Sequence, residues 1–177
     1  MKTKNIKGRI KEYFFLNPTL KLRVRQIERQ VKVPLPSVIR YTKELEIEKV
    51  LKSSQIANIT TYSSDRTSKQ FLLDKKLFNI ERLFSSGLIG FLVEQLSNPA
   101  LVVFGSFSRG EDIEKSDIDL YVETPSRKKI NLEKFEKALQ RKIQIFVYNN
   151  IHDIENKELA NNIVNGILLN GFVEVFK

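Results

Sequence analysis

Apolar residues recur at helical spacing through the first third of the chain. In residues 3–16, Ile6, Ile10 and Phe14 fall on one face, and Asn17-Pro18 ends the predicted helix. Two short helices joined by a proline-containing turn are predicted next, followed by a two-stranded hairpin with a polar tip. In order, these elements are helix 25–31, helix 37–47, strand 47–51, tip 52–55 and strand 56–62.

A connecting helix is predicted over residues 67–85, and its apolar positions follow a coiled-coil rhythm. Their spacing of four, three and four residues is that of a and d positions in a heptad. The stripe consists of Leu73, Leu77, Ile80 and Phe84. It either pairs two subunits or packs onto a domain of the same chain, and the sequence leaves both open. Ser85-Ser86-Gly87 marks a boundary after this helix.

Strands and helices alternate in the remainder of the chain. The predicted order is helix 88–96, strand 101–104, a turn with a short helix, strand 118–123, helix 131–140, strand 143–148, helix 156–169 and strand 172–176. This pattern predicts an α+β fold with a small mixed sheet and helices packed on it. The expected domains are 1–66, 67–87 as a connecting helix, and 88–177.

Positive charge is concentrated at the N-terminal end. The net charge is +9, and residues 1–66 alone hold 15 Lys and Arg against 6 Asp and Glu. Residues 99–177 hold 11 against 12 and are nearly neutral. A basic segment joined to a neutral one is typical of a nucleic-acid-binding domain fused to a second domain.

The stretch Leu101–Glu123 contains the candidate chemistry. An apolar strand ends at Gly105-Ser106, and after a polar loop Asp117 and Asp119 alternate with apolar residues. Period-two alternation places these carboxylates on one face of a strand, about 7 Å apart along the backbone. Such a pair favours Mg²⁺ or Mn²⁺ held together with substrate phosphates. Gly105 permits close approach to the backbone, and the Ser106 hydroxyl and N–H can bind an anion.

Two motifs in this stretch resemble the signature of the polymerase-β-type nucleotidyltransferases, especially the minimal ones. Gly105-Ser106-Phe107-Ser108-Arg109-Gly110 is similar to the family's Gly-Ser-x-Ala/Ser-Arg-Gly, and Ser116-Asp117-Ile118-Asp119-Leu120 to its Ser-Asp-Ile-Asp-Leu. The resemblance implies that Asp117 and Asp119 bind Mg²⁺ and catalyse transfer. It assigns Gly105 and Ser106 to the phosphates of a nucleoside triphosphate, with ATP the expected donor. Arg109 either neutralises phosphate charge or forms a salt bridge within its loop.

The family usually carries a third carboxylate on the next core strand. Here the matching residue is Gln144, which can neither act as a base nor hold a second metal by charge. Asp153, Glu155 and Glu123 are alternative carboxylates, although Glu123 lies about 13 Å further along its strand than Asp119. Otherwise the protein binds a nucleotide and turns it over slowly or not at all.

The N-terminal residues resemble a winged helix-turn-helix DNA-binding domain. In that resemblance Ser37, Arg40 and Lys43 lie at or near the major groove, while Lys52 and Arg66 contact phosphates. Docking to a protein, or binding RNA, are alternatives for this domain.

Together these features predict a Mg²⁺-dependent nucleotidyltransferase that transfers a nucleoside monophosphate to a protein or nucleic-acid acceptor and binds DNA. The alternative is a DNA-binding regulator, antitoxin-like, whose second domain binds nucleotide without turnover. A homodimer is possible through the apolar stripe. The sequence contains no cysteine, no signal-peptide core and no apolar run that could span a bilayer, so a cytoplasmic location without membrane contact is expected.

Overall fold

The computed structural model describes residues 6–176, so residues 3–5 of the first predicted helix lie outside the described part. The chain divides into two compact units, residues 1–78 and 79–177. The division falls inside helix α4 (Lys69–Ser85), which contributes residues to both units. The predicted three-part division at residues 66/67 and 87/88 stays a prediction.

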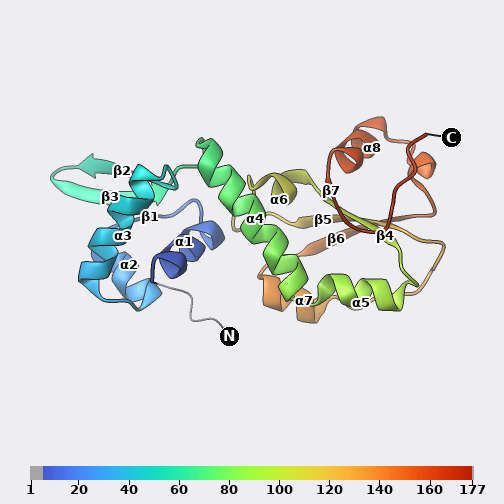
Figure 1. The fold of residues 1–177 in the computed structure, drawn as a ribbon, viewed down its shortest axis with the longest axis horizontal. Coiled ribbons are helices and arrows are strands. Elements are labelled where there is room, and N and C mark those ends of the chain that lie inside the picture. The colour runs from blue at the N-terminus through green and yellow to red at the C-terminus, as the bar shows by residue number, and fades with distance from the viewer. Residues whose placement is uncertain (1–5, 177) are drawn as a thin grey trace. The chain divides into compact units, whose positions relative to one another are not determined.

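The described part of the N-terminal unit contains three helices and three strands before the first residues of α4 (Figure 1). They are α1 (Ile6–Leu16), β1 (Lys21–Leu22), α2 (Val24–Val31), α3 (Leu35–Ile47), β2 (Leu51–Ile56) and β3 (Ile59–Ser64). The strands form an antiparallel sheet in the order β1-β3-β2. Helix α1 buries Ile10, Phe14 and Phe15 at the helical spacing seen in the sequence, against Ile27 of α2 and Val38 of α3. These helices therefore form where the apolar pattern predicted them.

A tight turn separates α2 from α3. Lys32 ends α2 in the left-handed conformation, with φ of 55°, and its N–H donates to the carbonyl of Glu28 at 2.8 Å. Pro34 caps the next helix, and Pro36 lies in its first turn, where the missing N–H costs no hydrogen bond.

The hairpin strands begin and end later in the chain than predicted, and the tip lies elsewhere. Residues 52–55, expected as a polar tip, belong to β2 instead. The turn consists of Ala57 and Asn58, both with positive φ of 47° and 63°, and Ile56 pairs with Ile59 across it. A two-residue turn with both φ values positive matches the twist of a hairpin. The turn was misplaced because the polar Ser and Gln residues of this exposed strand have the composition of a loop.

The C-terminal unit is built on a four-stranded mixed sheet. Its strands are β4 (Ala100–Phe104), β5 (Ile118–Glu123), β6 (Ile143–Tyr148) and β7 (Ile167–Asn170), in the order β6-β5-β4-β7. β5 and β6 are parallel, and the other two pairs are antiparallel. The helices are the C-terminal part of α4, α5 (Leu88–Gln95), α6 (Gly105–Arg109), α7 (Glu133–Leu139), the 3₁₀ turn η1 (Ile151–Asp153) and α8 (Lys157–Val164).

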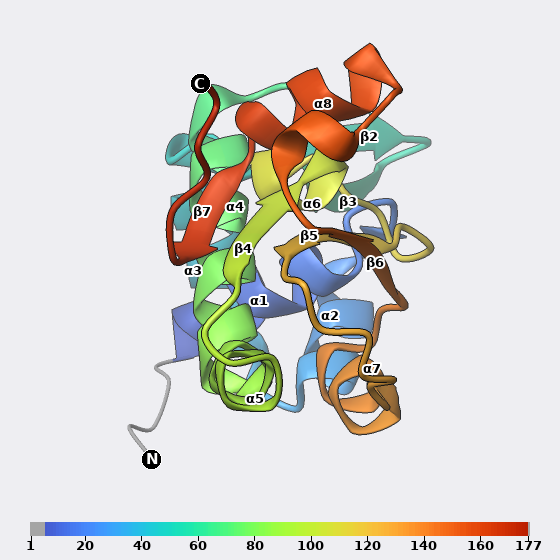
Figure 2. The ribbon, with the colours of Figure 1, turned by 90° about the vertical axis from the view of Figure 1, so that its right-hand side faces the viewer.

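Helices cover both faces of this sheet (Figure 2). On one face, alternate residues such as Leu101 and Leu120 pack against α4, α5 and α7. On the other, Val102, Phe104 and Tyr121 pack against η1 and α8. The predicted mixed α+β architecture is confirmed for this unit.

Two predictions near the C-terminal end were wrong. The helix expected over 156–169 ends at Val164, and residues 167–170 form β7. Gly166 explains the change, because a Cβ there would lie 2.6 Å from the Val103 carbonyl oxygen. The backbone thus passes directly against β4 and continues as its partner strand. Residues 172–176, expected as a strand, form no strand.

Within residues 6–176, no helix combines the length and apolar character needed to cross a membrane.

Candidate active site

Asp119 lies at the start of the central strand β5, between β4 and β6. Its register partners are Phe104, the last residue of β4, and Gln144, the second residue of β6. Asp117 comes just before the strand and is exposed, whereas Asp119 is partly buried. The two predicted carboxylates therefore lie at one end of the sheet, where β4 ends and β6 begins.

The backbone at Gly105 lies against the Asp119 carboxylate. A Cβ placed on Gly105 would be 2.4 Å from Asp119 Oδ2. Gly105 also has a φ of +71°, which side chains disfavour. Both facts require glycine here, so the sequence expectation of a close backbone approach is met by Asp119 itself. The glycine turn leads directly into α6, which contains Ser106 and Arg109.

Helix α6 fixes the positions of the predicted phosphate-binding residues. Ser108 donates a hydrogen bond from Oγ to the Gly105 carbonyl at 2.9 Å. Ser106 is partly buried in the first turn. Arg109 is exposed and pairs with Glu111, with 2.7 Å between Nε and Oε2. Arg109 thus forms the predicted salt bridge within its loop, and its contact with phosphate stays a prediction.

A buried polar network holds the loop between α6 and β5 in place. Asn79 on α4 donates from Nδ2 to the Phe107 carbonyl at 2.9 Å and to Asp112 Oδ1 at 2.8 Å. Asp112 also pairs with Arg141, at 3.7 Å from Nη2 to Oδ2, and all three side chains are buried. These residues were not predicted from the sequence. The signal that could have revealed them is a polar Asn79 inside an apolar helix pattern.

The surroundings of Asp119 disfavour its ionised form. Burial, and then the charge of Asp117, raise the pKa of Asp119. Both causes disfavour the ionised form, so binding a proton or a cation relieves them. Asp117 and Asp119 are thus the residues that could hold a metal ion. Among residues 6–176, no cluster of three or more His, Cys, Asp or Glu side chains could do so.

The strand register places Gln144 directly beside Asp119, where the sequence comparison of motifs had put it. The Gln144 side chain is exposed. The alternative carboxylates lie elsewhere: Glu123, at the far end of β5, accepts a hydrogen bond from the Tyr121 hydroxyl at 2.6 Å. The charge of Asp153 acts on the buried Tyr121, whose pKa is raised chiefly by burial. The site therefore has two carboxylates with an amide beside them.

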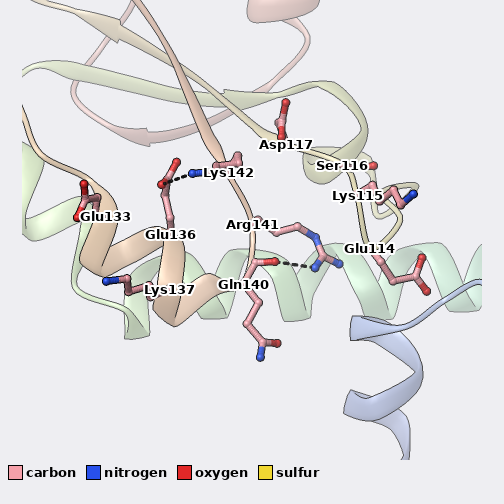
Figure 3. Close-up of a pocket in the computed structure, with 10 residues that line it drawn as sticks. All are labelled: Glu114, Lys115, Ser116, Asp117, Glu133, Glu136, Lys137, Gln140, Arg141 and Lys142. Carbon is pink, nitrogen blue, oxygen red and sulfur yellow. Dashed lines mark hydrogen bonds and ion pairs between the residues drawn. The ribbon is translucent and has the colours of Figure 1, made fainter.

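A charged pocket of about 530 Å³ opens next to Asp117 (Figure 3). Its walls come from the loop before β5, from α7 and from the residues between α7 and β6. The lining residues are Glu114, Lys115, Ser116, Asp117, Glu133, Glu136, Lys137, Gln140, Arg141 and Lys142. Glu136 joins two of these walls, because it accepts from the Ile143 N–H at 3.0 Å and from Lys142 Nζ at 3.1 Å. These hydrogen bonds lower the pKa of Glu136.

Comparison with known proteins bears on this unit. Residues 86–169 match the family model described as "Nucleotidyltransferase domain". The match includes the glycine turn, both carboxylates and Gln144. This part of the C-terminal unit is therefore similar to nucleotidyltransferase domains of the polymerase-β-like type, which supports nucleotidyl transfer in general terms. No curated protein matched the chain, and neither did any solved structure.

The predicted nucleic-acid-binding residues lie in the N-terminal unit, outside this match. Ser37, Arg40 and Lys43 are on α3, Lys52 is on β2, and Arg66 follows β3. Arg40 pairs with Glu44 at 2.8 Å, and Lys52 lies 3.9 Å from Asp65. A second hollow of about 450 Å³ lies between α2, α3 and the hairpin, lined in part by Arg23, Arg25 and Asn58.

Proposed function

We propose that this protein transfers a nucleoside monophosphate from a nucleoside triphosphate, with ATP the expected donor, to a protein or nucleic-acid acceptor. The observation that carries the proposal is the approach of Gly105 to Asp119, with Asp117 beside them. This approach places a backbone turn that can bind phosphates next to two carboxylates, and their negative charge favours a bound cation.

The carboxylates fit Mg²⁺ or Mn²⁺. Magnesium in proteins commonly uses one or two carboxylates together with substrate phosphates, and Asp117 and Asp119 provide that number. Bound there, the ion would neutralise phosphate charge during transfer. A second metal ion would have Gln144 where a carboxylate is needed, so the donor set fits one ion better than two.

The other residues act on the triphosphate. The Ser106 hydroxyl and the N–H groups of the turn would donate hydrogen bonds to the β- and γ-phosphates. Arg109 would add a positive charge after leaving Glu111, and an exposed ion pair of this kind contributes only about 0–1 kcal/mol. The pocket beside Asp117 adjoins this site without including Gly105, Ser106 or Asp119, and the lysines in its walls, Lys115, Lys137 and Lys142, suit a negatively charged acceptor.

In the transfer step, an acceptor oxygen forms a bond to the α-phosphorus, and the bond from that phosphorus to the bridging β-oxygen breaks. Pyrophosphate leaves, and the acceptor hydroxyl loses its proton. Gln144 cannot take up this proton, so it passes to solvent or to a substrate phosphate. Positioning and charge neutralisation then supply most of the acceleration.

For the N-terminal unit we propose DNA binding through a winged helix-turn-helix. Three helices, the tight turn before α3 and the β2-β3 hairpin support this assignment. The charge excess of residues 1–66 supports contact with a polyanion. Arg40 and Lys52 would exchange their exposed carboxylate partners for phosphates or bases. Arg23 and Arg25, which line the hollow beside the hairpin, are further candidates for phosphate contacts.

The position of Gln144 favours a second candidate function. A domain with two carboxylates can bind a nucleotide with Mg²⁺ while turning it over slowly or not at all. The protein would then be a DNA-binding regulator, antitoxin-like, that responds to nucleotide.

The test uses α-labelled ATP, GTP, CTP and UTP with Mg²⁺, and the full chain alone or with total cell extract. We expect label on a protein or nucleic-acid band, and its loss in Asp119→Asn. Glu123→Gln is the matched control, because it removes a carboxylate from the far end of the same strand and should retain transfer. Nucleotide binding without labelling in any lane would refute transfer and support the regulator.

A further inference from the structure

Helix α4 presents an apolar stripe to solvent. Leu73, Leu77 and Phe84 are 51%, 59% and 52% exposed, and Ile80 at the same spacing is partly buried. The opposite side of the helix is occupied, because Phe71 and Leu83 are buried in the cores of the two units. Within the described residues, the chain itself covers the side with Phe71 and Leu83 and part of Ile80, whereas Leu73, Leu77 and Phe84 stay exposed. We call Gln70, Leu73, Leu77, Ile80 and Phe84 the α4 seam.

The seam has the spacing of a two-stranded coiled coil. In heptad terms, Gln70, Leu77 and Phe84 are a positions, and Leu73 and Ile80 are d positions. Such a stripe fits a second helix with the same repeat, since a and d side chains insert between those of the partner. An exposed apolar stripe of this regularity is more than the scattered apolar residues of an ordinary surface.

The charged residues beside the seam favour a parallel over an antiparallel partner helix. Lys69 and Lys76 occupy the g positions, and Asp74 and Glu81 occupy the e positions. In a parallel, in-register pair each g residue faces the e residue five positions further along the other helix. Lys69 then meets Asp74, and Lys76 meets Glu81. In an antiparallel pair, lysines would face lysines and acids would face acids.

From this complementarity we infer that a second copy of this chain covers the α4 seam, with the two helices parallel and in register. Of the two charge pairs, Lys76 with Glu81 is the more effective, because Asp74 already contacts Lys11 and Gln70 within its own chain. The helix is held by its buried side before pairing, so association requires no helix formation, which is the unfavourable step for short isolated helices.

The mass of the full chain in solution tests self-association. Light scattering or sedimentation should give twice the chain mass of 20.6 kDa. Leu77→Glu should reduce it to the single-chain mass without changing the circular dichroism spectrum, because Leu77 is 59% exposed. Leu168→Glu is the matched control, a leucine 49% exposed outside α4, and it should remain dimeric. A single-chain mass for the unmodified protein, or a dimer unaffected by Leu77→Glu, would overturn the inference.

Charge reversal and crosslinking test the direction. Lys76→Glu and Glu81→Lys should each weaken the dimer, and the double variant should restore it. The chain has no cysteine, so any disulfide must form between the single cysteines that are introduced. Gln70→Cys and Phe84→Cys should each form a disulfide with the same position of the second copy. A disulfide formed only when the two variants are mixed would mean an antiparallel pair and would refute the proposed arrangement.

Discussion

Asp119 and Gln144 occupy the same register position on the parallel strands β5 and β6. Their side chains therefore point to the same face, and the amide lies where a third carboxylate would complete the acidic site. Gln144→Glu should raise the rate of nucleotidyl transfer, up to the roughly 10²–10⁴-fold that a general base contributes. Initial rates with labelled ATP and Mg²⁺ measure this. Gln55→Glu, on the hairpin of the N-terminal unit, should have no effect, and a rate unchanged in Gln144→Glu would mean that this position plays no part.

Asp119 should lower the stability of the folded chain at neutral pH. Its pKa in the folded protein lies above the ordinary 3.8 because of burial and the charge of Asp117. The folded state thus holds the proton more tightly than the unfolded state, and stability falls as pH rises through the folded-state pKa. Asp119→Asn should be more stable than the unmodified chain at pH 7 without metal, by roughly 2–4 °C in Tm for each 1 kcal/mol.

Thermal unfolding with a chelator, followed from neutral pH to below 3.8, measures this effect. The advantage of Asp119→Asn should shrink as the pH falls. Glu123→Gln serves as the control on the same strand. An Asp119→Asn variant less stable at pH 7 would contradict the expectation. A stabilised variant that no longer transfers label would separate loss of chemistry from loss of fold.

Gly105→Ala should destabilise the C-terminal unit. The added Cβ would meet Asp119 Oδ2 at 2.4 Å, and the φ of +71° disfavours any side chain. A residue held in such a conformation costs about 1–3 kcal/mol. Denaturation in urea gives the free energy of unfolding. Adding Asp119→Ala should recover part of the loss, because it removes the clash and leaves the φ penalty.

Gly90→Ala is the matched control for this change. Gly90 lies in α5 with nothing within 4 Å of an added Cβ. Alanine is the better helix former by about 1 kcal/mol, so this variant should be neutral or more stable. Equal effects of the two alanines would mean that the turn at Gly105 is not strained.

DNA binding by the N-terminal unit should depend steeply on salt. Each phosphate neutralised by Lys or Arg adds about 0.9 to the slope of log affinity against log salt concentration. Lys43→Ala, on α3, should weaken binding and lower the slope by about one. Fluorescence anisotropy with the full chain measures it, and Lys157→Ala on α8 is the control. A slope near zero would exclude DNA contact through these charges.

The sequence predicted those parts of the fold in which a short pattern decides the structure. Period-two alternation located β5, and the glycine turn located the approach to Asp119. The hairpin tip was misplaced because exposed strand residues such as Ser53 and Ser54 carry no apolar signal. The end of α8 was missed because it depends on Gly166 passing against β4, a contact made across the sheet.

Long-range contacts explain what the sequence did not reveal about the site. Asn79 and Asp112 are 33 positions apart in the chain and meet only in the folded unit. Arg141 joins them from the residues just before β6. Gln144 was located from motif order alone, and the parallel register then placed it beside Asp119. Motifs thus identified the reacting groups, and packing identified the residues that hold their loop.

The α4 seam gives the proposed DNA binding a symmetry. Two parallel helices share a twofold axis, and in each copy the basic residues 1–66 precede the Lys69 end of α4, so both basic segments enter the pair at the same end. Two DNA-binding domains related by a twofold axis bind an inverted repeat in the DNA, and the dimer sets the spacing between the half-sites. The second half-site is then bound by a dimer that is already on the DNA. Occupancy of the DNA site therefore responds more sharply to protein concentration than it does for a single DNA-binding domain.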